Sequence, residues 1–229
     1  MIKHLAFIMD GNRRWAKKKG WLPWYGHKEG IEAAKRVIKF CIDNNISCLS
    51  LYTFSIENFK RPANEIKYLF NVIVSEAVSI IKEFKEKGVR ARFIGDRLQF
   101  PKEIQTTCTE IEQETVNGKA LHLNLLFCYG ARQEIIGAVN SIIEETKQGK
   151  WEEKNLTPAL FANYLWTAAI PDPDLIIRTG GAKRLSNFLL YQAAYSELYF
   201  LDCLWPDITD NHLKEAILFF NQSKRNFGT

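Results

Sequence analysis

The chain alternates short apolar runs with longer segments whose apolar residues recur at every third or fourth position. Apolar runs predict strands at residues 5–9, 47–54, 89–94, 120–129, 175–177 and 198–200. Helical spacing predicts helices at residues 31–45, 62–87, 101–115, 131–147 and 210–225, with shorter helices starting near residues 12 and 158. Such alternation is typical of one mostly parallel sheet covered by helices. We therefore expect a single α/β domain over residues 1–229, with a central six-stranded sheet.

Two local signals bear on the segment between the first predicted strand and the helix predicted at residues 31–45. Asn12 follows the turn residues Asp10 and Gly11 and is a favourable helix N-cap, so a helix is expected to start there. The two glycines Gly26 and Gly30 predict a joint before the next helix.

Composition limits the classes of protein that the chain can represent. The 31 Lys and Arg residues against 26 Asp and Glu residues give a net charge of +5, which suits anionic ligands such as phosphates. This charge is modest and no recognition motif is present, so a nucleic-acid-binding module is disfavoured. Five cysteines without a Cys-x-x-Cys or Cys/His cluster indicate reduced thiols and a cytoplasmic protein.

Hydropathy bears on how the chain would meet a lipid. No run of about 18 apolar residues is present, so no membrane-spanning helix is predicted. The apolar patch before Asp10 is too short for the core of a signal peptide. A lipid substrate would therefore be met inside a protein pocket or at a membrane surface, so a cytoplasmic location with peripheral membrane contact is expected.

Polar residues gather where predicted strands end. In parallel sheets, ligands bind at the carboxyl ends of the strands. Five residues fall at such ends and are expected to line one cleft: Asp10, Ser55, Asp96, Tyr129 and Arg178.

The first cluster of interest is Asp10-Gly11-Asn12-Arg13-Arg14-Trp15. A strand-end carboxylate can hold a hard cation such as Mg²⁺ through its oxygens. The helix start that follows offers unpaired N–H groups to a phosphate, and an arginine adds a fork of donors. The alternative is a capped helix with exposed arginines.

The second cluster, residues 53–62, packs hydroxyls, a carboxylate, an amide and an arginine into one strand-to-helix loop. Its alternative is a polar loop whose side chains satisfy turn backbone. The third cluster, residues 178–187, combines Arg178, Arg184 and Ser186 with two glycines, which is the composition of an anion site. A structural Gly-Gly turn is its alternative, and Glu197 beyond it could supply a second metal carboxylate.

The clusters occur in a specific order along the whole chain. The sequence runs Met9-Asp10-Gly11-Asn12-x-Arg14-Trp15, Gly26-His27-x-x-Gly30, Tyr52-x-Phe54-Ser55-x-Glu57-Asn58-x-x-Arg61-Pro62, Asp174-Leu175-x-Ile177-Arg178-Thr179-Gly180-Gly181, Arg184-x-Ser186-Asn187 and Tyr195-x-Glu197-Leu198. In this order and spacing the chain resembles the cis-prenyltransferases, most of all the bacterial undecaprenyl diphosphate synthases.

The resemblance implies a Mg²⁺-dependent enzyme, a homodimer with a hydrophobic tunnel beside its parallel sheet. It would condense isopentenyl diphosphate onto an allylic diphosphate, farnesyl or geranyl diphosphate, to make a long cis-polyprenyl diphosphate. By resemblance the product is undecaprenyl diphosphate, used for the cell-wall lipid carrier. A shorter-chain synthase and a non-catalytic partner subunit remain as alternatives. A phosphatase with a nucleophilic Asp is disfavoured, since it needs a second Asp where Asn12 stands.

The resemblance also implies roles for individual residues. Asp10 would bind Mg²⁺ and assist departure of the diphosphate, with Glu197 contributing to the metal site. The allylic diphosphate would be held by Gly11, Asn12, Arg13, Arg14, His27 and Arg61, and isopentenyl diphosphate by Arg178, Arg184 and Ser186. Trp15, Glu57 and Phe59 would frame the isoprenoid. Asn58, helped by Ser55, would accept the proton; because a neutral amide is a poor base, Asn58 could instead orient the substrate.

Some positions depart from the family pattern. Arg13 stands where the bacterial enzymes usually have Gly, and Pro23 stands where an Arg is usual in the allylic-diphosphate site. We hypothesise that Arg13 or Lys183 replaces that missing charge. Residues 62–87 with Leu51, Leu121, Leu123 and Leu125 are expected to form the tunnel wall, and bulk at Leu126 and Phe127 is expected to narrow it.

Overall fold

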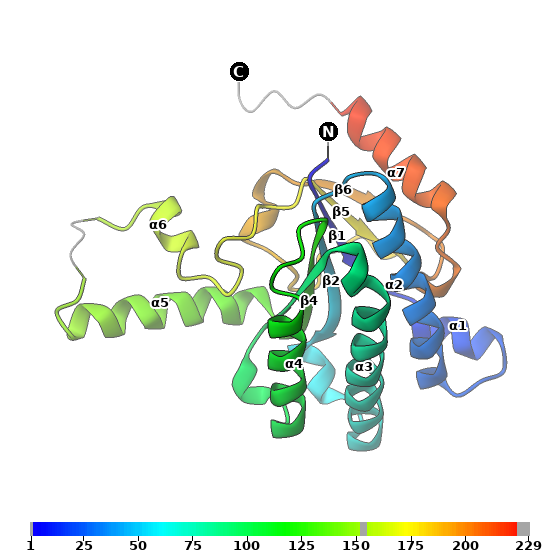
Figure 1. The fold of residues 1–229 in the computed structure, drawn as a ribbon, viewed down its shortest axis with the longest axis horizontal. Coiled ribbons are helices and arrows are strands. Elements are labelled where there is room, and N and C mark those ends of the chain that lie inside the picture. The colour runs from blue at the N-terminus through cyan, green and yellow to red at the C-terminus, as the bar shows by residue number, and fades with distance from the viewer. Residues whose placement is uncertain (1, 152–154, 224–229) are drawn as a thin grey trace.

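The computed structural model describes residues 2–151 and 155–223, which fold around one six-stranded sheet (Figure 1). The strands are β1 (His4–Ile8), β2 (Cys48–Ser55), β3 (Val89–Ile94), β4 (Leu121–Tyr129), β5 (Leu175–Arg178) and β6 (Glu197–Phe200). Their spatial order is β3-β4-β2-β1-β5-β6, and every neighbouring pair is parallel. The prediction of a mostly parallel six-stranded sheet is therefore confirmed.

The helices follow the predicted order, with shifts at several ends. The α-helices are α1 (Asn12–Lys18), α2 (Gly26–Asp43), α3 (Ala63–Phe84), α4 (Lys102–Glu114), α5 (Ala131–Lys147), α6 (Pro158–Ala162) and α7 (Asp210–Gln222). Short 3₁₀ helices add η1 (Pro23–Tyr25), η2 (Ile56–Lys60), η3 (Lys85–Lys87), η4 (Arg97–Gln99), η5 (Gln192–Tyr195) and η6 (Trp205–Asp207). The expected end of the last helix at residue 225 lies outside the described residues.

Two local predictions were wrong. Asn12 is the first residue of α1 and not its cap, because Gly11 takes the cap position with a left-handed φ of 113°. Residues 26–30 do not form a joint. They open α2, since η1 already makes the turn immediately before Gly26.

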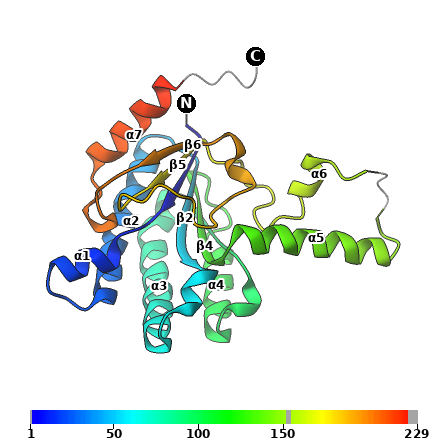
Figure 2. The same cartoon turned by 180° about the vertical axis from the view of Figure 1, so that it is seen from behind.

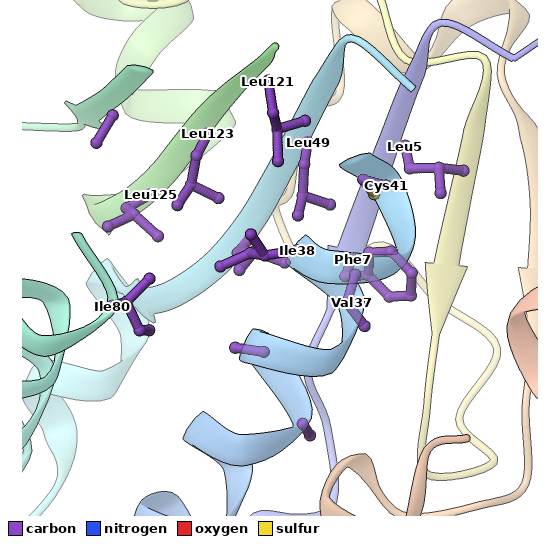
Figure 3. Close-up of a cluster of buried hydrophobic side chains, with 14 of the residues drawn as sticks. Leu5, Phe7, Val37, Ile38, Cys41, Leu49, Ile80, Leu121, Leu123 and Leu125 are labelled. Atoms are coloured by element: carbon purple, nitrogen blue, oxygen red, sulfur yellow. The ribbon is translucent and has the colours of Figure 1, made fainter. Parts of the chain in front are cut away.

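Alternating side chains of the strands serve two separate hydrophobic clusters. Leu5 and Phe7 point to the face covered by α2, α3, α4 and α7, whereas Ala6 and Ile8 belong to the cluster on the other face. Figure 3 shows Ile38 of α2 facing Leu49 and Leu123, and Val37 beside Phe7, in the first cluster. The second face is covered by the start of α5 and by the largely irregular chain between residues 165 and 193.

The helix α5 leaves the body of the molecule and extends sideways from the sheet in both views (Figures 1 and 2). Within residues 2–151 and 155–223, no helix is long and apolar enough to cross a membrane.

Candidate active site

Asp10 lies just past the end of β1, between two arginines from distant parts of the chain. Its Oδ2 accepts a hydrogen bond from Arg178 Nη2 at 2.9 Å, and its Oδ1 lies 3.3 Å from Arg14 Nη2. The sheet explains this meeting, because Ile8 of β1 pairs in register with Arg178 of β5. The carboxyl ends of these two strands thus place a carboxylate and two guanidinium groups together.

Thr179 and Gly180, which were assigned no individual role from the sequence, fix the backbone around Asp10. The buried Thr179 donates from Oγ1 to the Asp10 carbonyl at 2.7 Å. Gly180 has a φ of 83°, and its carbonyl accepts from Arg14 Nη2 at 2.8 Å. A Cβ on Gly180 would lie 2.3 Å from Arg14 Nη2, so the glycine is required for this approach. In the sequence, the pair Gly180-Gly181 directly after the strand was the signal for such a close backbone approach.

A cavity of about 410 Å³ opens beside Asp10 and is strongly basic. It is lined by Met9, Asp10, Gly11, Asn12, Arg13, Arg14, Lys17, His27 and Arg61. All six residues that the resemblance assigned to the allylic diphosphate therefore line this one cavity. The four cationic side chains outnumber the single carboxylate, which is the electrostatic character that a diphosphate needs.

The buried Glu65 organises two of these cations, although sequence reasoning did not single it out. Its Oε1 lies 3.2 Å from Arg61 Nη1 and 3.7 Å from Arg13 Nε. The spacing of four residues from Arg61 was the signal for this contact. Arg13 lines the basic cavity, whereas Lys183 is exposed and does not, so only Arg13 is placed to replace a cation at position 23.

His27 meets the same cavity with an uncharged ring. Burial lowers its pKa from 6.5 to about 4, and the nearby charges of Arg61 and Arg13 act in the same direction. Its Nε2 atom is buried and has no hydrogen-bond partner among the described residues. A neutral imidazole beside two guanidinium groups can donate a hydrogen bond to an anion that binds there.

A second cavity, of about 660 Å³, continues from the basic one toward α2 and α3. Its apolar walls come from Ile8, Met9, Ile31, Ala34, Leu51, Leu69, Val72, Ile80 and Leu125. Met9, Asp10, Asn12, His27 and Arg61 line both cavities. The basic chamber and the apolar chamber therefore meet at Asp10.

The tunnel wall differs in part from the expectation. Leu51 and Leu125 line the apolar cavity as predicted, but Leu121 and Leu123 are packed in the core and do not reach it (Figure 3). Leu126 belongs to the cluster on the opposite face of the sheet, so it cannot narrow the tunnel. Its neighbour Phe127 is instead packed among other phenylalanine rings, with Phe54, Phe70 and Phe100.

The arginine-rich loop near residue 184 closes the apolar cavity on its polar side. The Arg178 side chain is only 5% exposed, and its Nη1 donates to the Arg184 carbonyl at 2.6 Å and to Ser186 Oγ at 2.7 Å. Arg178, Arg184 and Ser186 all line this cavity, as their predicted role requires.

Asn187, which the sequence reasoning did not assign, joins this loop to the second cluster. Its Nδ2 donates to Glu57 Oε1 at 2.9 Å, and its Oδ1 accepts from the backbone N–H of Arg132 at 2.9 Å. Ser186 and Asn187 have left-handed φ values of 52° and 63°. Asparagine tolerates this conformation better than most residues do, so the backbone itself favours Asn187 here.

Asn58 faces the apolar cavity, but its amide oxygen is already used. Asn58 Oδ1 accepts from the Ser55 backbone N–H at 3.0 Å, and the Ser55 side chain accepts from the Asn58 backbone in return. The amide NH₂ group remains to face a substrate, and it is a donor. The geometry therefore favours the orienting role of Asn58 over proton acceptance.

Besides the tunnel residues and Lys183 already described, five more residues singled out from the sequence line neither cavity. Asp96 and Tyr129 end their strands away from the cleft, while Trp15 donates from Nε1 to Asp207 and Phe59 packs against Phe54 and Phe70.

Glu197 is the fifth. It pairs with Leu175 at the start of β5, whereas Asp10 follows the strand ends near Arg178. Three residues along the strand amount to roughly 10 Å, and two strands across add about as much again. Glu197 therefore lies far from Asp10 of the same chain, and its predicted contribution to the metal site stays a prediction.

The site nevertheless fits Mg²⁺. No group of three or more His, Cys, Asp or Glu side chains is suited to a metal within the described ranges. The carboxylate of Asp10 is 30% exposed and faces both cavities. Mg²⁺ in phosphate-transfer sites is commonly bound by one or two carboxylates together with the phosphates of the substrate. A single carboxylate beside a basic cavity matches that pattern.

The chain as a whole matches one family of known proteins. Residues 8–228 match the sequence profile described as "Putative undecaprenyl diphosphate synthase". The chain belongs to this family of cis-prenyltransferases. An isoprenyl transferase of Clostridium perfringens is 41% identical over 100% of this chain and 90% of the relative. A (2E,6E)-farnesyl-diphosphate-specific ditrans,polycis-undecaprenyl-diphosphate synthase of Buchnera aphidicola is 40% identical over 99% of this chain and 91% of the relative.

Solved structures agree with this assignment. Lavandulyl diphosphate synthase of Lavandula x intermedia, solved with dimethylallyl diphosphate, superposes with a TM-score of 0.95 at 31% identity, covering 100% of this chain and 98% of that one. A Campylobacter jejuni protein described as a "probable undecaprenyl diphosphate synthase" gives 0.83 at 36% identity, covering 100% and 99%. The basic and apolar chambers of this cis-prenyltransferase thus lie in an established prenyltransferase fold.

Proposed function

We propose that this cis-prenyltransferase lengthens farnesyl or geranyl diphosphate with isopentenyl diphosphate and, with Mg²⁺ held at Asp10, makes undecaprenyl diphosphate for the cell-wall lipid carrier. The observation that carries the proposal is the meeting of the two chambers at Asp10. A diphosphate placed in the basic chamber puts its prenyl tail in the apolar one.

The residues of the basic chamber act on the leaving group. When the C–O bond of the allylic diphosphate breaks, negative charge develops on the departing oxygens. Arg13, Arg14 and Arg61 surround that position and stabilise the charge where it forms. Mg²⁺ at Asp10 would supply further stabilisation of the same charge.

The loop around Arg178 positions the second substrate. Arg178, Arg184 and Ser186 hold the diphosphate of isopentenyl diphosphate, so its double bond faces the allylic carbon in the same cavity. The new C–C bond forms as the allylic C–O bond breaks, and a proton then leaves the extended chain. Because the Asn58 oxygen is occupied, a diphosphate oxygen or water takes that proton, and Asn58 orients the substrate.

The product outgrows the apolar chamber. A cavity of about 150 Å³ holds one benzene-sized ligand, so about 660 Å³ accommodates roughly 25 carbons. An undecaprenyl chain consists of eleven five-carbon isoprene units and therefore has 55 carbons. The distal part of such a product must therefore extend beyond this cavity.

We further propose a homodimer located in the cytoplasm and in contact with the membrane. Ile136, Val139 and Ile143 form an apolar stripe on the projecting helix α5, with 59%, 37% and 45% of their surfaces exposed. A large exposed apolar stripe on one helix is typical of a subunit interface. Replacing Ile136 and Ile143 by Glu is expected to convert the dimer to a monomer, as measured by sedimentation velocity. If the variant remains a dimer, α5 is not part of the interface.

The function is tested with labelled isopentenyl diphosphate, each allylic primer in turn and Mg²⁺, followed by sizing of the lipid product. Undecaprenyl diphosphate is expected as the main product. Shorter products would support the short-chain alternative, and no elongation with any primer would refute the enzyme proposal. A non-catalytic partner subunit would also show no elongation alone but would bind a second prenyltransferase subunit.

A further inference from the structure

The stretch from residue 11 to residue 28 is strongly cationic. It contains six Lys and Arg residues and no Asp or Glu, so its formal charge of +6 exceeds the +5 of the whole protein. The stretch forms α1, the turn after it, η1 and the first residues of α2. We call it the α1–η1 lobe. Both views show α1 and the following turn protruding at the edge of the molecule (Figures 1 and 2).

Large apolar side chains are displayed at the tip of this lobe. Trp21, Leu22 and Tyr25 expose 48%, 51% and 46% of their surfaces. Lys18 and Lys19 immediately before them are exposed as well. Exposed aromatic and aliphatic side chains therefore follow directly after two exposed lysines, and we call these five residues the patch.

The tip is held in this conformation by its own backbone. Gly20, with a φ of 74°, donates from its N–H to the Lys17 carbonyl at 3.0 Å, and the Trp21 N–H donates to the Ala16 carbonyl at 2.9 Å. The Trp21 ring packs edge-on against Trp15, with centroids 5.6 Å apart. Trp15 is anchored in turn by its hydrogen bond to Asp207. The exposed apolar side chains are therefore carried by a fixed turn.

The chemistry of the patch matches an anionic lipid surface. Trp and Tyr rings favour the boundary between headgroups and hydrocarbon, because they combine an apolar body with a polar edge. Lysines beside them are attracted to anionic headgroups, and insertion of Leu22 removes apolar surface from water. A nucleic acid would use the lysines but would give the exposed Leu22 no role. We propose that the α1–η1 lobe docks this protein onto the surface of an anionic lipid bilayer.

The lobe lies beside the chamber that holds the prenyl tail. Tyr25 packs edge-on against Tyr68 of α3, with centroids 6.2 Å apart. The next residue of α3, Leu69, and the nearby His27 of α2 both line the apolar cavity. A bilayer at the lobe would therefore receive the part of the product that outgrows the cavity. This last step rests on the proposed function, whereas docking itself does not.

Flotation with lipid vesicles tests the docking in the absence of any substrate. Full-length protein is expected to float with vesicles of phosphatidylglycerol and phosphatidylcholine, and much less with phosphatidylcholine alone or in high salt. Trp21→Ser with Leu22→Ser is expected to lower partitioning at least about tenfold. Lys18→Gln with Lys19→Gln is expected to lower it about 25-fold, since each interfacial lysine contributes about fivefold.

Matched substitutions elsewhere serve as controls. Leu98 is 93% exposed on η4, and Lys147 and Lys150 are exposed near the far end of α5. Leu98→Ser and the pair Lys147→Gln and Lys150→Gln are expected to leave partitioning unchanged. Equal losses in control and lobe variants, or no binding of the unmodified protein to anionic vesicles, would overturn the proposal.

Two further measurements separate membrane docking from self-association and from damage to the active site. Sedimentation velocity of the Trp21→Ser, Leu22→Ser variant shows whether the patch joins two copies of this chain. A loss of self-association with unchanged vesicle binding would overturn membrane docking. The rate of elongation of a water-soluble primer without vesicles is expected to be unchanged in the lobe variants. A lobe variant that fails to float with vesicles but elongates the primer normally supports docking. If the unmodified protein shows no elongation at all, only the proposed function is refuted.

Discussion

Asp10 and Arg178 lie 168 positions apart in the sequence, and one hydrogen bond of 2.9 Å joins them. The bond links the end of β1 to the end of β5, and hence the basic chamber to the arginine-rich loop. Arg178 does not depend on Asp10 alone, because its Nη1 is bonded to the Arg184 carbonyl and to Ser186. This arrangement lets the catalytic and structural contributions of Asp10 be measured separately.

Asp10→Asn is expected to lower kcat about 100-fold or more, because it removes the negative charge from the point where the two chambers meet. The fold is expected to persist, since Arg178 keeps its other acceptors. Circular dichroism and single-turnover elongation provide the measurements. Asp96→Asn is the matched control, because Asp96 caps η4 and lines neither cavity. Near-normal turnover in Asp10→Asn would contradict the proposed role.

Arg178→Lys is expected to raise KM for isopentenyl diphosphate about 10- to 100-fold. A lysine cannot serve Asp10, the Arg184 carbonyl and Ser186 at once, and each hydrogen bond to a charged group contributes about 1.5–3 kcal/mol. Steady-state kinetics with saturating allylic primer would measure the change. Arg132→Lys, at an exposed position, is expected to have no effect. Equal KM values in the two variants would show that Arg178 does not hold this substrate.

His27 is expected to change its pKa when an anion fills the basic chamber. Without ligand its pKa is about 4, held low by burial and by Arg61 and Arg13. A diphosphate would offset those charges, so the pKa in the complex is higher. The complex then binds a proton more readily than the free protein, and affinity increases as the pH falls through the pKa of the complex. NMR titration of the ring with and without pyrophosphate checks this.

The exposed His122 provides an internal reference for that titration. Its pKa is lowered by its own partial burial and by Arg90 and Arg92, which do not line either cavity. Pyrophosphate is expected to leave the His122 resonance unchanged. A His27 pKa that stays the same when pyrophosphate binds would exclude contact between His27 and the diphosphate.

Asn187 is expected to act as a positioning residue for the loop that binds isopentenyl diphosphate. Asn187→Asp keeps the acceptor for the Arg132 N–H but replaces the donor to Glu57 with a second carboxylate oxygen. KM for isopentenyl diphosphate is expected to rise about tenfold, because like charges now face each other across the cleft. Adding Glu57→Gln restores the hydrogen bond with its direction reversed, so that position 57 donates and position 187 accepts. Recovery of KM in the double variant would show that this contact, and not a general loss of the fold, caused the defect.

Glu76 is expected to influence product length. It is a carboxylate in the wall of the apolar cavity, eleven residues along α3 from Glu65, or roughly 16 Å. Isoprene units of a growing product that reach Glu76 come into contact with its carboxylate. Glu76→Leu is expected to shift products toward longer chains by one or more units, as measured by chromatography of the dephosphorylated lipids. Glu83→Leu is the control, since Glu83 is a carboxylate on the same helix, 3.7 Å from Lys35, but does not line the cavity.

The sequence predicted the sheet well because each strand carries its own apolar signal. The strand-end positions of Asp10, Ser55 and Arg178 followed directly, and all three line the cleft. Side-chain direction was harder to predict. Leu123 and Leu126, three residues apart on β4, serve opposite faces by strand alternation, but the sequence did not show which face adjoins the cavity. Phe127 packs with rings from three distant segments, and such contacts depend on the tertiary fold.

Residues that act through contacts between loops were also missed. Asn187 and Glu65 are ordinary polar residues in the sequence, and their importance appears only when Glu57 and Arg13 are placed beside them. Glu197 shows the reverse case. Its motif suggested a metal ligand, but its register against Leu175 puts it at the opposite end of the sheet from Asp10.

The position of β1 in the middle of the sheet has a consequence for how the protein is made. On one side β1 pairs with β2, which follows it closely, and on the other with β5, whose first residue is Leu175. Pairings between residues so distant in sequence close slowly, because a long loop must be ordered first. During synthesis, the edge of β1 that pairs with β5 therefore stays unpaired until most of the chain has left the ribosome. Only then does Arg178 arrive beside Asp10, so catalytic competence is acquired late, with the last quarter of the protein.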